Sequence, residues 1–205
     1  MVVIPLPQTE DNTETEMDTD DKPRLPPGQH LIEELPTLHV GGVPPFDPKT
    51  WTLRLEGEVR EPKTLTYQEL RALPSVIDVS DFHCVESWSL FDIAWEGVRF
   101  SDLADLVSPT ERARFVTIGC DGEYTTSLPL ADLLRPDVLL AWGMNGKDMP
   151  PEKGFPLRLI VPHKYAYKAA KWVRWIRFTY EQETGYWEQR GYSNSADPWK
   201  EERYA

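Results

Sequence analysis

The sequence lacks the features that mark membrane and secreted proteins. It contains no run of about 18 consecutive apolar residues, so we expect no membrane-spanning helix. The first residues, MVVIPLPQTEDNTETEMDTDD, show neither a basic n-region nor a twin arginine, so we expect no secretory signal and a cytoplasmic location. The two cysteines, Cys84 and Cys120, match no zinc-binding spacing, and in a cytosolic chain a disulfide between them is not expected.

Several catalytic and nucleotide-binding motifs are also missing. The chain has no G-x-G-x-x-G after a predicted strand, and GMNGKD lacks the spacing and the Ser or Thr of a phosphate-binding loop. It has no H-E-x-x-H, C-x-x-C or G-x-S-x-G, and its four histidines have no metal-ligand spacing. The common dinucleotide-binding, zinc-protease and serine-hydrolase signatures are therefore excluded.

Basic residues are scarce, at 22 against 34 acids, but many of them gather in one segment. Residues 153–177 carry seven bases and no acid: Lys153, Arg158, Lys164, Lys168, Lys171, Arg174 and Arg177. An acidic protein with one basic segment is poorly suited to nucleic acid and well suited to a local pocket for a small phosphorylated anion. The alternative is a basic strand face whose charges pair with acids elsewhere on the surface.

The N-terminal residues have the opposite charge. Between Glu10 and Asp21 there are seven acids and no base, which predicts an acidic, disordered tail over residues 1–25. The remaining residues, 26–205, are enough for one domain with a substantial hydrophobic core. We expect this domain to begin with an irregular arm rich in Pro and Gly.

Short apolar patterns predict an α+β fold of mixed sheets with brief helices. Thr66 and Glu69 form the capping box of one expected helix, in LTYQELRAL, and Ser101 is the expected cap of another, in FSDLADLV. PLADLL is expected to form about one helical turn. Strands are expected in TWTLRLEGEV, SVIDVSDF, DVLLAW (before an Asn-Gly turn), FPLRLIVP and KWVRWIRF, with a hairpin in RFVTIGCDGEYTTSL.

Cys84, in DFHCVESWSL, has several possible roles. Unpaired cysteines are most often small buried residues, but this one follows a predicted strand and lies between His83 and Glu86. Bases from residues 153–177 would stabilise a thiolate here, and a thiolate is a natural ligand for a thiophilic metal. A hydrolase nucleophile, served by His83 or His163, is a further possibility for which we identify no orienting partner. Cys120, at a strand end before an Asp-Gly turn, is expected to be structural.

With Cys84 and the basic segment, a third stretch completes a recognisable pattern. The segments CVESWS (84–89), GFPLRLIVPHKYAYKAAKW (154–172) and GYWEQRGYSNSADPW (185–199) resemble the molybdopterin-binding domain of the sulfite oxidase family. They are most similar to its small bacterial and archaeal oxidoreductases with a C-V-E-x-W-S motif. The resemblance implies an α+β domain that holds molybdenum on a pterin dithiolene and performs two-electron oxygen-atom transfer. On composition alone, the third stretch is either a packing strap or a site wall.

The resemblance also implies roles for individual residues. Cys84 matches the protein ligand to molybdenum, and Tyr192 matches the tyrosine beside the oxo ligands; both are expected to be catalytic. The expected cofactor-binding residues are His39, Cys120, Lys153, Arg158, Ala169, Ala170 and Lys171. Among these, Arg158 and Lys171 match positions that hold the pterin phosphate.

The chain departs from sulfite oxidases at two positions. Ser89 and His39 stand where those enzymes have arginines, and losing two cations would weaken binding of the sulfite dianion. A sulfoxide or N-oxide is therefore at least as good an expected substrate as sulfite. No haem-binding domain is present in the sequence, so we expect electrons to pass to a separate partner. The alternative function is a non-catalytic module that binds molybdopterin or another phosphorylated ligand.

Overall fold

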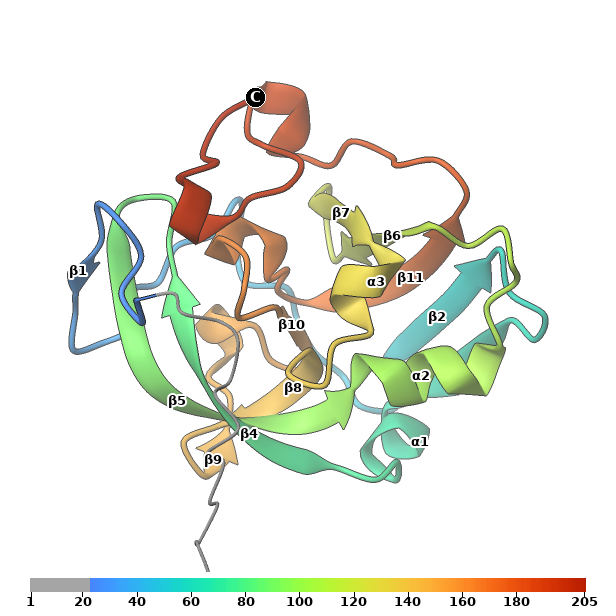
Figure 1. The fold of residues 1–205 in the computed structure, drawn as a ribbon. Coiled ribbons are helices and arrows are strands. Elements are labelled where there is room, and N and C mark those ends of the chain that lie inside the picture. Colours follow the sequence, from blue (N-terminus) through green and yellow to red (C-terminus); the bar gives the residue numbers. More distant parts are fainter. Residues whose placement is uncertain (1–22) are drawn as a thin grey trace, which may run out of the picture.

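A computed structural model describes residues 23–205 as two β-sheets joined by short helices and long loops (Figure 1). Most of the predicted acidic tail, residues 1–25, lies outside the described residues. In residues 23–205 no helix is both long and apolar enough to cross a membrane. The arrangement confirms the expected α+β fold with mixed sheets.

The first sheet carries Cys84 at a tight turn. Its strand order is β1 (His30–Leu31), β5 (Trp88–Arg99), β8 (Leu139–Met144) and β10 (Arg158–Ile160), with β4 (Val76–His83) paired to β5 and β9 (Lys147–Asp148) paired to β8. Strands β4 and β5 are antiparallel and appear as the long curved pair in Figure 1. Because Cys84 follows β4 directly, it lies in the turn that joins these two strands.

The second sheet contains the basic strand of the sequence. Its order is β3 (Lys63–Thr66), β2 (Thr52–Gly57), β11 (Val173–Thr179), β6 (Phe115–Cys120) and β7 (Thr125–Pro129). Strand β11 runs parallel to β2 and antiparallel to β6, so the sheet is mixed.

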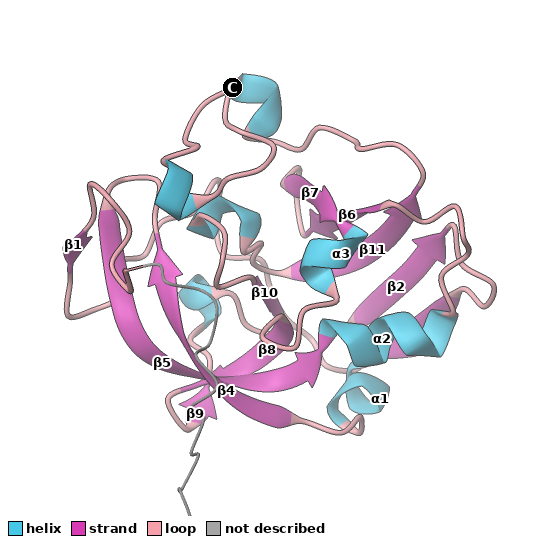
Figure 2. Ribbon diagram, in the orientation of Figure 1, coloured by secondary structure: helices cyan, strands magenta, loops and turns pink. Residues whose placement is uncertain are grey.

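The helices are short and lie mostly at the ends of strands (Figure 2). They are α1 (Tyr67–Arg71), α2 (Phe100–Val107) and α3 (Leu130–Leu133), with 3₁₀ turns η1 (Pro151–Lys153), η2 (Ala166–Lys168), η3 (Glu188–Arg190) and η4 (Pro198–Lys200). The main hydrophobic core packs Phe100 and Leu103 of α2 against residues of the second sheet such as Leu53 and Ile118. A second cluster surrounds Cys84 and includes Phe82 and Trp95.

The predicted cap of α1 is confirmed and that of α2 is wrong. Thr66 Oγ1 accepts a hydrogen bond from the Glu69 amide, and the Glu69 carboxylate accepts one from the Thr66 amide. Helix α2 starts at Phe100, before Ser101, and its N-cap Arg99 makes no side-chain cap bond. Strand β5 runs directly into α2, and the Phe100 amide donates to the Val138 carbonyl, so tertiary contacts fix this helix start.

The other local predictions are largely confirmed. Strands β6 and β7 form the expected hairpin, and Asn145-Gly146, both with positive φ, joins β8 to β9. Strand β5, the longest in the described chain, was not predicted, because SWSLFDIAWEG has no sustained alternation of polar and apolar residues.

Two irregular segments complete the domain. The N-terminal arm, residues 32–46, precedes β2 and has mostly exposed side chains. The C-terminal strap, residues 185–205, follows β11 and crosses the molecule near β7 (Figure 1). The strap is held by main-chain hydrogen bonds from Tyr186 to Thr125 and from Tyr165 to Ala196.

Candidate cofactor site

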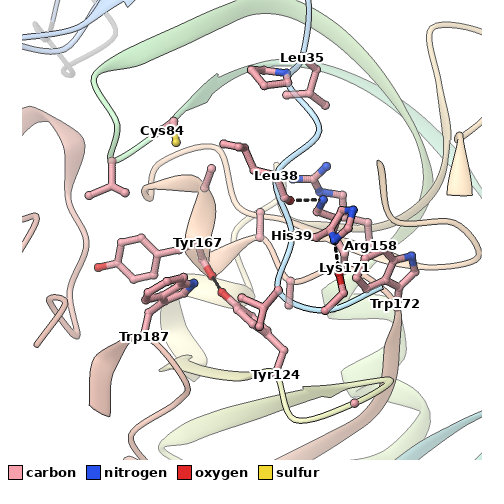
Figure 3. A pocket seen from close by; sticks show the side chains of 18 of the residues that line it. Leu35, Leu38, His39, Cys84, Tyr124, Arg158, Tyr167, Lys171, Trp172 and Trp187 are labelled. Atoms are coloured by element: carbon pink, nitrogen blue, oxygen red, sulfur yellow. Dashed lines mark hydrogen bonds between the residues drawn. The ribbon is translucent and has the colours of Figure 1, made fainter. Parts of the chain in front are cut away.

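A cavity of about 760 Å³ brings the three informative segments of the sequence together. Figure 3 shows the arm passing through the view, with Cys84 on one side and Arg158, Lys171 and Trp172 on the other. The volume lies within the range of about 300–1,000 Å³ that is usual for ligand and cofactor sites. The predicted site residues that line it are His39, Cys84, Arg158, Ala169, Ala170, Lys171 and Tyr192.

Two predicted cofactor-binding residues do not line the cavity. Cys120, at the end of β6, is buried in the main hydrophobic core. Lys153, at the end of η1, donates from Nζ to the Leu35 carbonyl and to Thr37 Oγ1, both at 2.6 Å. Lys153 therefore anchors the arm beside the cavity.

The backbone around Cys84 is held by several hydrogen bonds. Its amide donates to the Trp88 carbonyl at 2.8 Å, and its carbonyl accepts from Gln29 Nε2 at 3.1 Å and from the Ser87 amide. Ser87 closes the turn with a φ of +72°. The turn presents the thiol to the cavity on a backbone with little freedom to move.

Burial raises the pKa of the Cys84 thiol to about 11, and the nearby Glu86 carboxylate adds to this. A hydrolase nucleophile requires the opposite shift, and it also requires an adjacent base. His83 is not among the lining residues, and its Nδ1 lies 2.8 Å from Ser89 Oγ, on a side chain that is 2% exposed. His163 does not line the cavity either, so the geometry does not support the nucleophile hypothesis.

Arg158, the first residue of β10, is the principal buried cation of the cavity. Its guanidinium lies 4.8 Å from the Phe82 ring centroid, and Nη1 donates to the Lys153 carbonyl at 2.8 Å. In residues 23–205, Nε is buried without a hydrogen-bond partner and no carboxylate pairs with the group. Burial lowers the pKa of Arg158 to about 10, so it stays protonated at neutral pH. A buried, incompletely bonded guanidinium is suited to an anionic ligand.

Lys171 supplies a second cation at the same end of the cavity. Its Nζ donates to the Leu38 carbonyl of the arm and, at 3.0 Å, to the Glu152 carbonyl. Gly154 permits this crowding, because a Cβ there would lie 3.0 Å from Arg158 Cβ and 3.2 Å from Lys171 Cγ. Burial is the main cause that lowers the pKa of Lys171 to about 7, and the charges of Arg158 and Lys153 contribute to this value.

Two small residues directly precede Lys171 in the sequence. Ala169 and Ala170 are 4% and 2% exposed and line the cavity. Their amides already donate within the turn, to the Ala166 and Lys168 carbonyls at 3.0 Å. Because these amides already have acceptors, the two alanines contribute mainly space beside Lys171.

Aromatic residues of the strap and of η2 form one wall of the cavity and pack in the same cluster as Val85, the residue after Cys84. The ring centroid of Tyr192 lies 5.3 Å from that of Tyr167 and 5.0 Å from that of Trp187, and all three line the cavity. Tyr124, which sequence reasoning missed, also lines it and donates to the Tyr167 carbonyl (Figure 3). Only its place after the Asp-Gly turn of the β6–β7 hairpin hints at this role. The strap is therefore both a packing element and a site wall.

Comparison with known proteins identifies the family. A family model described as "Oxidoreductase molybdopterin binding domain" matches residues 40–187. The chain belongs to this family. The sulfite oxidase-type resemblance seen in the sequence is thereby confirmed, and the protein is a molybdopterin-binding oxidoreductase.

The individual relatives differ in how much of their length they share with this chain. "Uncharacterized oxidoreductase YuiH" of Bacillus subtilis is 41% identical over 91% of this chain and 94% of its own length. "Protein-methionine-sulfoxide reductase catalytic subunit MsrP" of Campylobacter jejuni is 31% identical over 70% of this chain, which spans only 54% of that protein. The sulfane dehydrogenase SoxCD of Paracoccus pantotrophus matches in structure, with a TM-score of 0.64 over 70% of this chain and 41% of its own, at 20% identity. That last likeness shows a common fold.

The cavity residues of this oxidoreductase fit a molybdenum-bound molybdopterin. The cofactor carries a phosphate and a soft metal, and the cavity offers a guanidinium with an unbonded Nε together with a thiol. Arg158 and Lys171 would hold the phosphate, and Cys84 would bind the metal. The described residues contain no group of three or more His, Cys, Asp or Glu side chains that could hold a metal ion by itself. A metal delivered by an organic ligand, with one protein thiolate, is consistent with this donor set.

Proposed function

We propose that this molybdopterin-binding oxidoreductase reduces a small, neutral oxo substrate, an organic sulfoxide or an N-oxide. The observation that carries the proposal is one cavity lined by the Cys84 thiol, by an aromatic wall and by Arg158, which no carboxylate of residues 23–205 neutralises and which would serve as an anion site. When bound, the molybdenum–pterin group supplies two-electron oxygen-atom transfer. For a sulfoxide the balance is one substrate, two electrons and two protons in, and one thioether and one water out.

The charges that line the cavity favour a neutral substrate over sulfite. Arg158 and Lys171 are its Lys and Arg side chains, and both would be engaged by the cofactor phosphate. The remaining acidic or basic lining groups are His39 and three carboxylates, those of Glu86, Asp121 and Glu123. Asp121 is paired with Arg174, but the carboxylates of Glu86 and Glu123 would repel a dianion, whereas they would not repel an uncharged sulfoxide.

Ser89 adds a second reason against sulfite. Its side chain is fully buried, and its hydroxyl lies 2.8 Å from His83 Nδ1 and 3.2 Å from Gln29 Oε1. It does not line the cavity, so no hydrogen-bonding group from this position reaches a substrate there.

Residues of the chain would position the substrate and limit water. Tyr192, Trp187 and Tyr167 offer an apolar wall with a phenolic hydroxyl on Tyr192, which can donate to an oxo group. The two electrons would come from a separate partner. The name of the Campylobacter relative, "catalytic subunit", supports such a division of labour.

Metal analysis of paired cysteine variants tests this proposal. We expect protein from a host that makes the cofactor to contain about one molybdenum and one pterin per chain. Cys84→Ala should lose at least about 90% of the molybdenum, because a charge-donating ligand is removed. Cys120→Ala, in the core and outside the cavity, is the matched control and should keep it. A Cys84→Ala protein with full molybdenum would contradict the assignment of the ligand.

A substrate screen tests the second half of the proposal. With a reduced artificial electron carrier, dimethyl sulfoxide, methionine sulfoxide and an N-oxide should be reduced. Sulfite oxidation, measured separately with the oxidised form of the carrier as electron acceptor, should be slower by at least about tenfold, the loss expected when one charge-assisted contact is absent. Sulfite turnover that exceeds every sulfoxide and N-oxide would overturn the choice of substrate.

A further inference from the structure

Lys168 is the fully buried base of the 153–177 segment, and it does not line the cavity. Its side chain is 0% exposed, and Nζ donates to Glu188 Oε1 at 2.5 Å and to the Ser127 carbonyl at 3.0 Å. Burial lowers the pKa of Lys168, and the charge of Glu188 opposes this shift. The ammonium group is thus held in the interior by one carboxylate and one backbone carbonyl.

Glu188 joins the strap to two other elements. Its Oε1 also accepts from Thr126 Oγ1 at 2.6 Å, so one carboxylate oxygen links η2, β7 and η3. In the described part of the chain its Oε2 is buried without a hydrogen-bond partner. A Cβ at Gly185 would lie 2.5 Å from the Thr125 carbonyl oxygen and 2.8 Å from Oε2, so the strap enters this contact at a glycine.

The ion pair lies directly behind two walls of the cavity. Tyr167 and Ala169, on either side of Lys168 in the sequence, line the cavity, and so does Trp187, which precedes Glu188. Tyr167 also donates to the Ser193 carbonyl at 2.6 Å, a second link between the two segments. Lys168 and Glu188 therefore connect the turn beside the cations to the aromatic wall beside the thiol.

Stability alone does not explain a buried ion pair at this place. Removing two charges from water is costly, and well-packed apolar residues of similar volume are often as stabilising. The pair does provide a fixed separation, because the two short contacts of Oε1 permit only one arrangement of η2, β7 and η3. Apolar side chains would fill the same volume without fixing the relative positions of η2, β7 and η3.

We propose that Lys168 and Glu188 are positioning residues whose ion pair holds the cofactor side and the substrate side of the cavity at one fixed spacing. The inference rests on the proposed function and assigns it two residues that touch neither cofactor nor substrate. It predicts that the pair matters more for retaining the pterin and for the KM of the sulfoxide than for folding.

The test uses the double variant Lys168→Met with Glu188→Met, in holoenzyme from a cofactor-producing host. The matched control is Lys164→Met with Asp132→Asn, because Lys164, four residues before Lys168, forms a 2.8 Å ion pair with Asp132 of α3 and neither residue lines the cavity. Pterin release is followed by fluorescence after dilution, folding by thermal unfolding, and turnover by kcat and KM for a sulfoxide.

We expect the double variant to unfold within a few degrees of the wild type, to release pterin at least tenfold faster and to raise KM at least threefold. The control should match the wild type in pterin release and KM. Equal pterin release and KM in the double variant and the control would overturn the proposal. If the double variant does not fold, the single variant Glu188→Gln is compared with its control Asp132→Asn. Pterin release from Glu188→Gln at least threefold faster than from the control supports the proposal, and equal release overturns it.

The same preparations separate this inference from the proposed function. A wild type without molybdenum and pterin refutes the function itself. A loaded wild type that reduces sulfoxides, beside variants that behave like the control, refutes only the positioning role.

Discussion

The seven bases of residues 153–177 separate into two groups that the sequence cannot distinguish. Four of them meet carboxylates: Lys164 with Asp132, Lys168 with Glu188, Arg174 with Asp121 and Arg177 with Glu56. The other three donate chiefly to main-chain carbonyls and, within residues 23–205, pair with no carboxylate: Lys153, Arg158 and Lys171. Those three gather at one end of the cavity. The proposed anion site would therefore consist of bases that no carboxylate of residues 23–205 neutralises.

This comparison supports the pairing alternative for four of the bases, and the phosphate pocket stays a prediction for the other three. Paired bases contribute to the fold, as the surface-pairing alternative expected. The three bases without carboxylates repel one another, and the charges of Arg158 and Lys153 help to lower the pKa of Lys171. A bound phosphate would relieve this repulsion and compensate the desolvation of Arg158.

The strongest test of the comparison sets Arg158→Met against Arg174→Met. Loss of Arg158 removes charge-assisted hydrogen bonds worth about 1.5–3 kcal/mol, so pterin retention should fall roughly 10- to 100-fold. Arg174→Met, which removes a base already paired with Asp121, should leave retention within about threefold. The pterin content and the pterin release rate of the purified variants are measured. Equal losses of pterin in the two variants would show that the paired and unpaired bases do not differ in cofactor binding.

A second test uses pH and Lys171 in cofactor-free protein. The pKa of Lys171 is about 7 in the folded chain and 10.5 for an ordinary lysine. Between these values the unfolded chain binds more protons at this site, so stability rises with pH from about 7 towards 10.5. Below about 7 both states are protonated, and the full cost of burying the charge remains.

Lys171→Met removes this dependence. Relative to the wild type, the variant should be most stable below pH 7 and should lose that advantage steadily up to pH 10. Urea unfolding at a series of pH values measures the difference. Arg177→Met is the control, since arginine stays protonated throughout. If the free energy of unfolding has the same pH dependence in the wild type and in Lys171→Met, burial does not lower the pKa of Lys171.

The smallest effect is expected in the paired group. Arg177 and Glu56 form a 3.0 Å ion pair with side chains 41% and 32% exposed. Such pairs contribute about 0–1 kcal/mol, so Arg177→Met should change the free energy of unfolding by no more than that and leave pterin content unchanged. Denaturant unfolding and pterin analysis would reveal a larger role if one exists.

Local signals predicted the local structure well. The Thr66–Glu69 capping box, the Asp-Gly hairpin and the Asn145-Gly146 turn all depend on residues within a few positions of one another. The predicted start of α2 was wrong because the first amide of the helix donates to the carbonyl of Val138, far away in the sequence. Strand β5 was not predicted for a related reason. It pairs with β1, β4 and β8, and no single face of it is uniformly apolar.

The sequence by itself determined the chemistry of this protein. One cysteine, one acid-free segment and one aromatic stretch sufficed to indicate a soft metal, a phosphorylated cofactor and the family that combines them. Only the tertiary structure decided which of these bases line the cavity and which are bound by other groups. It directed Arg158 and Lys171 into the cavity, and it assigned Lys153 to the arm and Lys168 to Glu188. The physical reason is that the effect of a charge depends on its partners. Glu188 is 20 positions from Lys168 in the sequence, and the arm residues Leu35 and Thr37 are more than 110 positions from Lys153.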